Sequence, residues 1–203
     1  MEKSSAQPKA RPGARQLARR AMTAQVAEMA IELFTERGYE GTTIDNICEV
    51  AGISRSTFFR YFPTKEDVLL RDYVDMDDSL LAALIARPDD ETPWVAIRRA
   101  LDPLIDQYSA NPERTLRSAK LFIETPTLVT FHREKLTRWG QFLTPELARR
   151  LGADPEDPTD PRATALITAA LACLDATLAA WATADGVPHL AQLLDRAMNA
   201  ITA

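Results

Sequence analysis

The stretch TTIDNICEVAGISRSTFFRYF, residues 42–62, contains two short helical patterns that are separated by a turn. One of its two opening threonines can cap the first helix, and apolar residues then recur at helical spacing as far as Gly52. Glycine suits a turn in which the backbone needs a positive φ angle. Ser54 can cap a second helix, which must finish before Pro63. The stretch therefore predicts a helix-turn-helix.

The second helix of this pair combines basic and aromatic residues. Phe58 and Phe62 are expected to lie in the core, where they would hold the pair of helices together. The positions left facing outwards are Arg55, Ser56, Phe59 and Arg60. Arginines on a short helix are usually no more than a solvated face, but an exposed Phe59 fits that interpretation poorly. It makes sense if the ring packs on a sugar, a thymine methyl group or a phosphate.

These side chains have the chemistry for reading DNA. Arg55 can donate two hydrogen bonds to O6 and N7 of guanine in the major groove. Tyr61 and Lys65, near the end of the helix, can reach phosphates and fix the register of the protein on the duplex. The outer face is therefore interpreted as a DNA-reading surface.

The charge of the chain is unevenly distributed around its net value of −5. Residues 1–66 contain ten Lys and Arg against eight Asp and Glu, whereas the remaining residues contain fourteen against twenty-one. The first twenty residues contain six basic residues and one acidic residue. This basic arm is either a segment that meets a polyanion or a solvated tail.

The composition is that of a soluble protein with a substantial core, with 46% hydrophobic and 26% charged residues among 203. Cys48 and Cys173 lie in apolar helical patterns and are expected to be buried thiols in a reducing compartment. No signal peptide is expected, because no apolar stretch follows the basic start. The longest uncharged run, from Ala163 to Leu174, is too short to span a bilayer. We expect a cytoplasmic protein without a membrane partner.

The spacing of apolar residues predicts an all-α fold of about nine helices, because no alternating strand pattern occurs. The expected divisions are a basic flexible arm over 1–16, a helix-turn-helix DNA-binding domain over 17–64, and a helical ligand-binding and dimerisation domain over 65–203. Pro103 is expected to kink its helix unless a new helix restarts there, and Pro145 is expected to break another.

The stretch GYEGTTIDNICEVAGISRSTFFRYFPTKEDVLL, preceded by a basic helix that ends in ELFTERGY, resembles the N-terminal domain of TetR-family transcriptional regulators. The resemblance covers about residues 17–70. It implies that the first three helices bind operator DNA, and that the C-terminal helices bind a ligand and form a dimer.

The resemblance also assigns DNA-contacting positions in this chain. It implies base or groove contacts for Arg55, Ser56, Thr57 and Thr43, and phosphate contacts for Tyr61 and Lys65. Phe59 stands where many members have tyrosine, so a hydroxyl donor to phosphate is missing there. The arginines Arg15, Arg19 and Arg20 would lie along the adjacent minor groove or backbone.

The C-terminal segment predicts a dimer interface. Ten alanines fall in a helix expected over about 162–185, and small residues let helices approach closely. Together with a last helix over about 189–201, this segment predicts a four-helix interface in a homodimer, whereas an internal hairpin is the alternative. A dimer would place two copies of the second helix of the helix-turn-helix, the one that contains Arg55, in successive major grooves about 34 Å apart.

The helices between these two regions are expected to enclose a pocket for a small molecule. Apolar residues at helical spacing usually belong to the core. For each candidate, lining a pocket and packing in the core are therefore both open. The candidate lining residues are Leu101, Leu104, Ile105, Tyr108, Phe122, Phe131, Trp139 and Phe142. No cluster has metal-ligand spacing, and neither a nucleophile motif nor a phosphate loop occurs. No metal, cofactor or catalytic set is therefore expected.

A second resemblance concerns the C-terminal half. The segments RTLRSAKLFIETPTLV and LDATLAAWATADGVPHLAQLLDRAM are similar to the C-terminal domain of mycofactocin-system regulators within the same family. Members of that wider group sense fatty acyl-coenzyme A, which implies an apolar tunnel with a basic mouth. The basic candidates are Arg98, Arg99, Arg117, Lys120, Arg133 and Arg138. The same residues equally fit a solvated face that pairs with nearby acids.

Taken together, these features predict a ligand-responsive transcriptional repressor. It would bind palindromic double-stranded operator DNA as a homodimer and be released by a hydrophobic effector, for which a long-chain acyl-coenzyme A is the implied candidate. The alternatives are a helical small-molecule carrier without specific DNA binding, a transcriptional activator of the same fold, and a helical enzyme. The absence of a convergent catalytic set argues against an enzyme.

Overall fold

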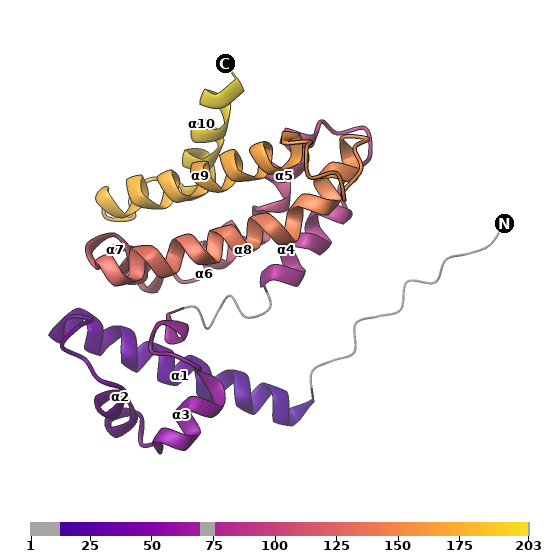
Figure 1. Ribbon diagram of the computed structural model, residues 1–203. Helices are drawn as coiled ribbons and strands as arrows, with labels where there is room; N and C mark the ends of the chain where they lie inside the picture. The colour runs from indigo at the N-terminus through magenta and orange to yellow at the C-terminus, as the bar shows by residue number, and fades with distance from the viewer. Residues whose placement is uncertain (1–12, 70–75, 203) are drawn as a thin grey trace.

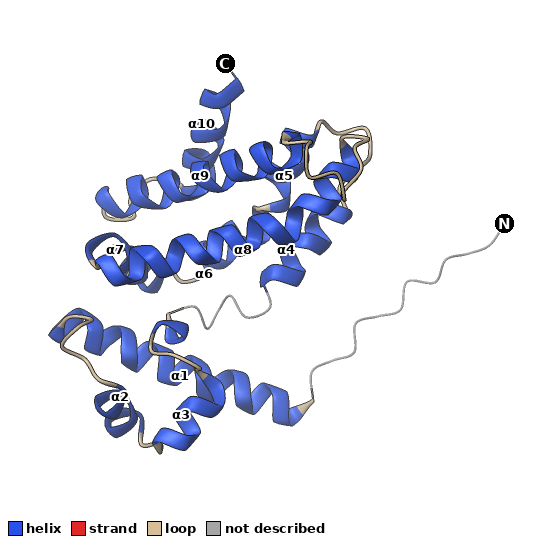
Figure 2. Cartoon of the chain, viewed as in Figure 1, coloured by secondary structure: helices blue, strands red, loops and turns tan. Residues whose placement is uncertain are grey.

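The computed structural model describes residues 13–69 and 76–202, which form helices and loops without a strand (Figure 2). The elements are α1 (Ala14–Arg37), α2 (Ile44–Ala51), α3 (Arg55–Tyr61), the 3-10 helix η1 (Glu66–Val68), α4 (Met76–Ile85), α5 (Pro93–Ala100), α6 (Asp102–Ala110), α7 (Pro112–Glu124), α8 (Pro126–Arg150), α9 (Arg162–Thr183) and α10 (Leu190–Thr202). The predicted all-α class is confirmed for the described residues.

Two prolines account for differences from the predicted helices. Pro103 lies in the first turn of α6, so of the two expected outcomes, a kink or a restart, the structure shows the restart, with α5 before it and α6 after it. Pro145 was expected to break α8, but this prediction is wrong, because α8 continues through it to Arg150. Proline removes only one main-chain donor. Leu143 and Leu147, on either side of it, are buried at 4% and 0% exposure and hold the helix against the core.

Two predicted boundaries also change. Helix α1 begins at Ala14, so the last residues of the predicted arm are helical, while residues 1–12 lie outside the described residues. The T-x-x-D spacing predicts a capping box, and the main-chain N–H of Thr64 does donate to Asp67 Oδ2 at 2.8 Å. The apolar spacing from Leu69 to Leu84 predicts one long helix after this box. The box opens only η1, α4 begins at Met76, and residues 70–75 lie outside the described residues.

Helices α1 to α3 form a small core beside the larger helical half of the chain (Figure 1). Phe58 and Phe62 are 0% and 2% exposed, as predicted, and they pack with Ile47 against the apolar side of α1. The same cluster includes Leu121 from α7 and Leu128 from α8. The core of the helix-turn-helix is therefore completed by residues from the C-terminal half.

The remaining helices, α4 to α10, surround a second core. Helix α9 lies between α8 and α10 in this bundle (Figure 1). It is the single helix in the described part of the chain that is long and apolar enough to cross a membrane, and 39% of its apolar window is buried. A core helix of a soluble protein meets the same criterion, and the packing against α8 and α10 accounts for the buried part of this apolar character.

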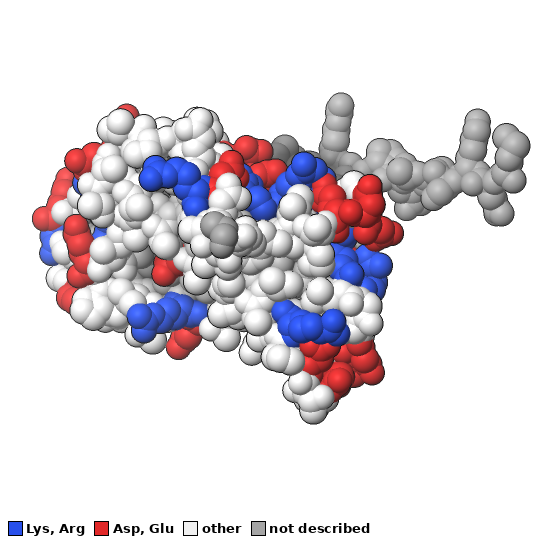
Figure 3. All heavy atoms as spheres, turned by 90° about the horizontal axis from the view of Figure 1, so that it is seen from above, with Lys and Arg blue, Asp and Glu red and all other residues white. Residues whose placement is uncertain are grey.

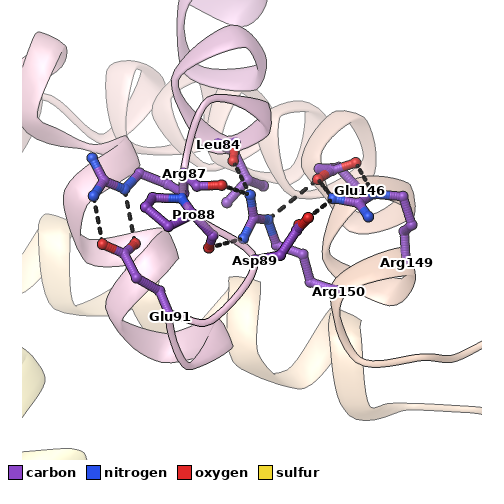
Figure 4. Close-up of polar contacts among 8 residues, drawn as sticks. All are labelled: Leu84, Arg87, Pro88, Asp89, Glu91, Glu146, Arg149 and Arg150. Carbon is purple, nitrogen blue, oxygen red and sulfur yellow. Dashed lines mark hydrogen bonds and ion pairs between the residues drawn. The ribbon is translucent and has the colours of Figure 1, made fainter. Parts of the chain in front are cut away.

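The end of α4 is fixed by Arg150 at the end of α8 (Figure 4). Its Nη2 donates to the carbonyl oxygens of Leu84 at 2.8 Å and Arg87 at 2.6 Å, and its Nη1 donates to that of Pro88 at 3.0 Å. Glu146 lies 3.2 Å from its Nε, and the Arg150 side chain is only 3% exposed. Carbonyls at a helix C-terminus lack α-helical partners. Arg150 supplies donors from a neighbouring element, in addition to the main-chain N–H groups of Arg87 and Glu91, which donate to the carbonyls of Leu84 and Pro88.

Helix α4 has a second polar contact with α8 near its beginning. Trp139 Nε1 donates to Asp77 Oδ1 at 2.6 Å, and Arg138 Nε lies 3.4 Å from the other carboxylate oxygen. Lys135, one turn before Trp139, is 5% exposed and places its Nζ 4.5 Å from the centroid of the indole ring. Burial lowers the pKa of Lys135 to about 7.

Candidate nucleic-acid interface

The turn between α2 and α3 has the geometry that its glycine predicts. Gly52 has a φ of 64° and a ψ of 32°, which is the left-handed region. The N–H of Ile53 donates to the carbonyl of Cys48 at 3.0 Å and closes the end of α2. Residues with a Cβ seldom adopt this conformation, so Gly52 fixes the direction in which α3 leaves α2.

Thr43 caps α2 at the start of the candidate interface. Its Oγ1 accepts from the N–H of Asn46 at 3.2 Å, and the Asn46 side chain accepts from the N–H of Thr43 at 3.0 Å. This reciprocal pair is a capping box, with asparagine in the position that glutamate or glutamine commonly occupies. Because Thr43 is exposed, its cap also leaves a polar group at the surface.

Three hydroxyl groups gather at the N-terminus of α3. Ser54 Oγ accepts from the N–H of Thr57 at 3.2 Å, and it lies 2.9 Å from Ser56 Oγ and 3.0 Å from Thr57 Oγ1. The cap therefore fixes the side chains that the sequence assigns to DNA contact. Hydroxyl groups of this kind can donate to phosphates or to base edges.

Arg55 and Phe59 lie together on the outer face of α3. Phe59 is 44% exposed, and the guanidinium carbon of Arg55 lies 5.8 Å from the centroid of its ring. Arg55 also donates from Nη1 to both carboxylate oxygens of Asp45 on α2. The sequence interpretation missed this carboxylate, because nothing in the spacing of ten residues shows that the two helices bring the side chains into contact.

Tyr61 lies between two cations at the C-terminal end of α3. The guanidinium carbon of Arg60 is 4.7 Å from the centroid of its ring, and that of Arg19 on α1 is 5.3 Å away. Arginines over an aromatic face are held by the ring quadrupole. The ring therefore joins α1 to α3, and Arg19, Tyr61 and Arg60 form a basic ridge. The sequence had assigned no DNA contact to Arg60. Arg15 and Arg20 are exposed in the first turns of α1.

Lys65 is held by the protein itself in this structure. Its Nζ donates to the carbonyls of Tyr39 at 2.9 Å and Thr42 at 3.0 Å, and it lies 3.8 Å from the centroid of the Tyr39 ring. The Tyr39 hydroxyl donates to Glu66. Burial and this carboxylate raise the pKa of Tyr39, so the phenol stays protonated. A phosphate contact by Lys65 stays a prediction.

Two family models together match most of this chain. The model described as "Bacterial regulatory proteins, tetR family" matches residues 26–71, which include the helix-turn-helix. The model described as "MftR C-terminal domain" matches residues 91–203. The chain belongs to the TetR family. Both resemblances that the sequence suggested are thereby confirmed, and the relatives in this family are transcriptional regulators.

Named relatives extend over both halves of this TetR-family chain. The HTH-type transcriptional regulator TcmR of Streptomyces glaucescens is 34% identical and covers 74% of this chain, with 70% of its own length matched. MftR of Mycobacterium tuberculosis, whose name assigns it to the regulation of mycofactocin biosynthesis, is 28% identical over 65% of this chain and 67% of its own length.

Solved structures of regulators share the fold. FadR from Bacillus subtilis in complex with stearoyl-CoA has a TM-score of 0.59 at 18% identity, covering 86% of this chain and 95% of that protein. FadR from Thermus thermophilus in complex with lauroyl-CoA has a TM-score of 0.50 at 23% identity, covering 87% and 91%. At these identities the likeness shows the TetR fold alone.

The C-terminal half of this TetR-family chain contains a small cavity of about 10 Å³. It is lined by Leu80, Leu84, Ile97, Ala100, Leu101, Leu143, Ile167 and Leu171. Only Leu101 belongs to the predicted pocket residues. Such a volume holds about one water molecule, so an apolar effector could enter this cavity only if the surrounding helices separated.

The other predicted pocket residues lie elsewhere around the C-terminal half. Leu104, Ile105, Tyr108 and Trp139 are buried in the second core, while Phe142 is 38% exposed. Phe122 packs against the core of the helix-turn-helix, and Phe131 is half-buried. Their role as effector contacts stays a prediction.

Most basic residues proposed for a pocket mouth are paired with acids. Arg98 contacts Asp102 and Asp195, Arg99 contacts Glu91, Arg117 contacts Glu28, Lys120 contacts Asp185, and Arg138 contacts Asp77. These pairs agree with the alternative that the sequence left open, a solvated face neutralised by nearby carboxylates. A phosphate would have to displace those carboxylates in order to bind.

Proposed function

We propose that this chain is a ligand-responsive transcriptional repressor that binds palindromic operator DNA. The observation that carries the proposal is the exposed face of the helix-turn-helix, which presents Thr43, Arg55 and Phe59 together with the hydroxyls at the start of α3. The face combines a group able to read guanine with groups able to hold phosphates. Arg19, Arg60 and Tyr61 extend it along one side as candidate backbone contacts.

The repressor would act as a homodimer through α9 and α10, over about residues 162–201. Exposed alanines on α9, with Leu166 and Leu178 half-buried beside them, offer a face on which a second copy can pack closely. From the side of α10, uncharged residues occupy the middle of the surface, and charged residues lie mostly towards its edges (Figure 3). A two-fold axis there would place two α3 helices on successive major grooves, about 34 Å apart.

The effector would be a hydrophobic small molecule that binds between the helices of the C-terminal half. The acyl-CoA complexes of two FadR proteins with the same fold support a long-chain acyl-coenzyme A as the first candidate. Because the cavity is so small here, entry of an acyl chain would separate α4 from α8 and α9. A ligand shifts an equilibrium between two conformations only if it binds one of them more tightly. The acyl chain would bind the conformation with separated helices, so DNA would have to bind the closed one.

The same proposal places the protein in the cytoplasm and gives it no catalytic activity. The buried thiols fit a reducing compartment, since Cys48 and Cys173 are each 6% exposed and burial raises the pKa of both. A thiol in that state is a packing group and not a nucleophile.

A gel-shift titration against the DNA that flanks the gene tests the repressor proposal. We expect salt-dependent binding that discriminates this DNA from random duplex, and its release by a long-chain acyl-coenzyme A. Specific binding that ignores the acyl-coenzyme A would retain the regulator and reject this effector. Equal binding to both duplexes would reject the regulator and favour a carrier. Transcription assays with purified polymerase separate repression from activation.

A further inference from the structure

Arg55 and Asp45 form an ion pair on the exposed face of the helix-turn-helix. Asp45 is the second residue of α2, and Arg55 is the first residue of α3. The two carboxylate oxygens lie 2.7 and 2.8 Å from the same nitrogen, Nη1. The side chains are 64% and 59% exposed, so both meet whatever approaches this surface.

The geometry leaves part of the guanidinium available for a base. Arginine carries five N–H groups in a rigid plane. Since both bonds to Asp45 use Nη1, the N–H groups on Nε and Nη2 still point away from the carboxylate. A guanine edge presents two acceptors, O6 and N7, and a bidentate contact needs two donors. Arg55 can therefore read guanine without giving up Asp45, while the Phe59 ring limits its movement from another side.

The charge of Asp45 has opposite consequences for bases and phosphates. A guanine edge is neutral, whereas each phosphate carries a negative charge, and random DNA is bound mainly through phosphates. A carboxylate beside Arg55 cancels much of its attraction for a phosphate and repels the phosphate directly. Specificity is the difference between the affinities for operator and for random DNA. A carboxylate that weakens the contact of Arg55 with phosphates therefore raises specificity.

We infer that Asp45 is a specificity-determining residue that positions Arg55 for guanine and opposes its use as a phosphate contact. The inference rests on the proposed DNA binding but adds a residue and a role to it. Exposed ion pairs contribute little to folding, so removal of the carboxylate leaves the helix-turn-helix intact. The role of Asp45 is therefore testable on folded protein.

The decisive variant is Asp45→Asn, compared with Glu49→Gln. Glu49 is an exposed acid on the same helix, so both substitutions remove one negative charge from α2. Affinity is measured for the operator and for random duplex over a series of salt concentrations. For Asp45→Asn we expect tighter binding to random DNA and a specificity ratio that falls on the order of tenfold. The salt slope on random DNA should steepen by about one. Glu49→Gln should keep the ratio of the wild type.

Base substitutions in the operator test the positioning role. Wild-type protein should depend strongly on one guanine in each half-site, and Asp45→Asn should lose much of that preference. In the Arg55→Ala background, Asp45→Asn should change the preference no further. An unchanged preference in Asp45→Asn, or equal effects of Asp45→Asn and Glu49→Gln, would overturn the inference while leaving the repressor proposal standing. Wild-type protein without specific binding would overturn both.

Discussion

Arg114 on α7 forms an ion pair with Glu28 on α1, with 3.0 Å between Arg114 Nε and Glu28 Oε2. The other oxygen of Glu28 pairs with Arg117, one turn along α7. A single carboxylate of the helix-turn-helix therefore holds two guanidinium groups of the C-terminal half. Leu121 and Leu128 continue this contact as apolar packing.

Glu28→Gln should lower the free energy of unfolding by about 1–2 kcal/mol, because two partly buried cations lose their common anion. Chemical denaturation measures this change. Glu32→Gln, one turn further along α1 at an exposed position, is the matched control and should change stability by less than about 0.5 kcal/mol. Equal effects of the two substitutions would mean that the ion pairs contribute nothing specific.

Arg55→Ala should reduce operator affinity by about 1–3 kcal/mol and relax the preference at one base pair. The physical reason is the loss of a bidentate donor to guanine. Binding to random duplex should change much less, because Asp45 already neutralises this cation. Arg149→Ala, which removes an exposed positive charge from α8, serves as the control. Equal losses on operator and random DNA would contradict base reading by Arg55.

Lys65→Met should weaken binding to all DNA sequences alike if the amine also reaches a phosphate, and should flatten the salt slope by about one. The structure adds an effect on folding. The variant loses two hydrogen bonds to the carbonyls of Tyr39 and Thr42, so the free energy of unfolding should fall by about 1–2 kcal/mol. Thermal denaturation without DNA separates the two effects, and an unchanged melting temperature would contradict the structural one.

Lys135 should make stability depend on pH. Burial lowers its pKa to about 7, whereas a lysine in an unfolded chain has a pKa of about 10.4. Between these values the unfolded chain binds more protons than the folded protein does. Raising the pH through this window therefore favours the folded state, by at most about 1.4 kcal/mol per pH unit.

The comparison of wild-type protein with Lys135→Met isolates this contribution. Arg138 lowers the pKa of the amine further, while Asp77 and Asp175 raise it. The stability of wild-type protein relative to the variant should rise from pH 7 to pH 9 and stay nearly level below about pH 6, where both states are protonated. A difference that is constant over the whole range would show that the Lys135 amine keeps an ordinary pKa.

Arg150→Met should lower the free energy of unfolding by about 2–4 kcal/mol, because the variant loses three hydrogen bonds to carbonyl groups in and just after the last turn of α4. The neighbouring Arg149→Met is a matched control. The Arg149 side chain is 54% exposed, so its substitution should change stability by less than about 0.5 kcal/mol. Similar losses for both variants would contradict a special role for Arg150.

Local sequence rules predicted much of the helix-turn-helix. Gly52, Ser54 and the capping pair of Thr64 and Asp67 each act within a few residues of their partners, so spacing alone reveals them. The burial of Phe58 and the exposure of Phe59 follow from helical periodicity. The outward position of Arg55 follows from the same rule.

Contacts between distant segments were beyond these rules. The continuation of α8 through Pro145 depends on leucines that pack against other helices. The burial of Lys135 depends on α4 and α9, and the position of Asp45 beside Arg55 depends on the angle between two helices. The small cavity shows the same limit, because residues that share a helical stripe need not enclose the same space.

The two attachments of α4 to α8 differ in strength. Arg150 holds the carboxyl end through three carbonyl groups, whereas Asp77 near the amino end accepts a single hydrogen bond from Trp139. In mechanical terms Arg150 is the fixed point of α4, while buried Met76 and Leu80 hold its amino-terminal part by apolar packing. If the proposed effector displaced the indole, the resulting shift of α4 would be smallest at Arg150 and largest at Met76.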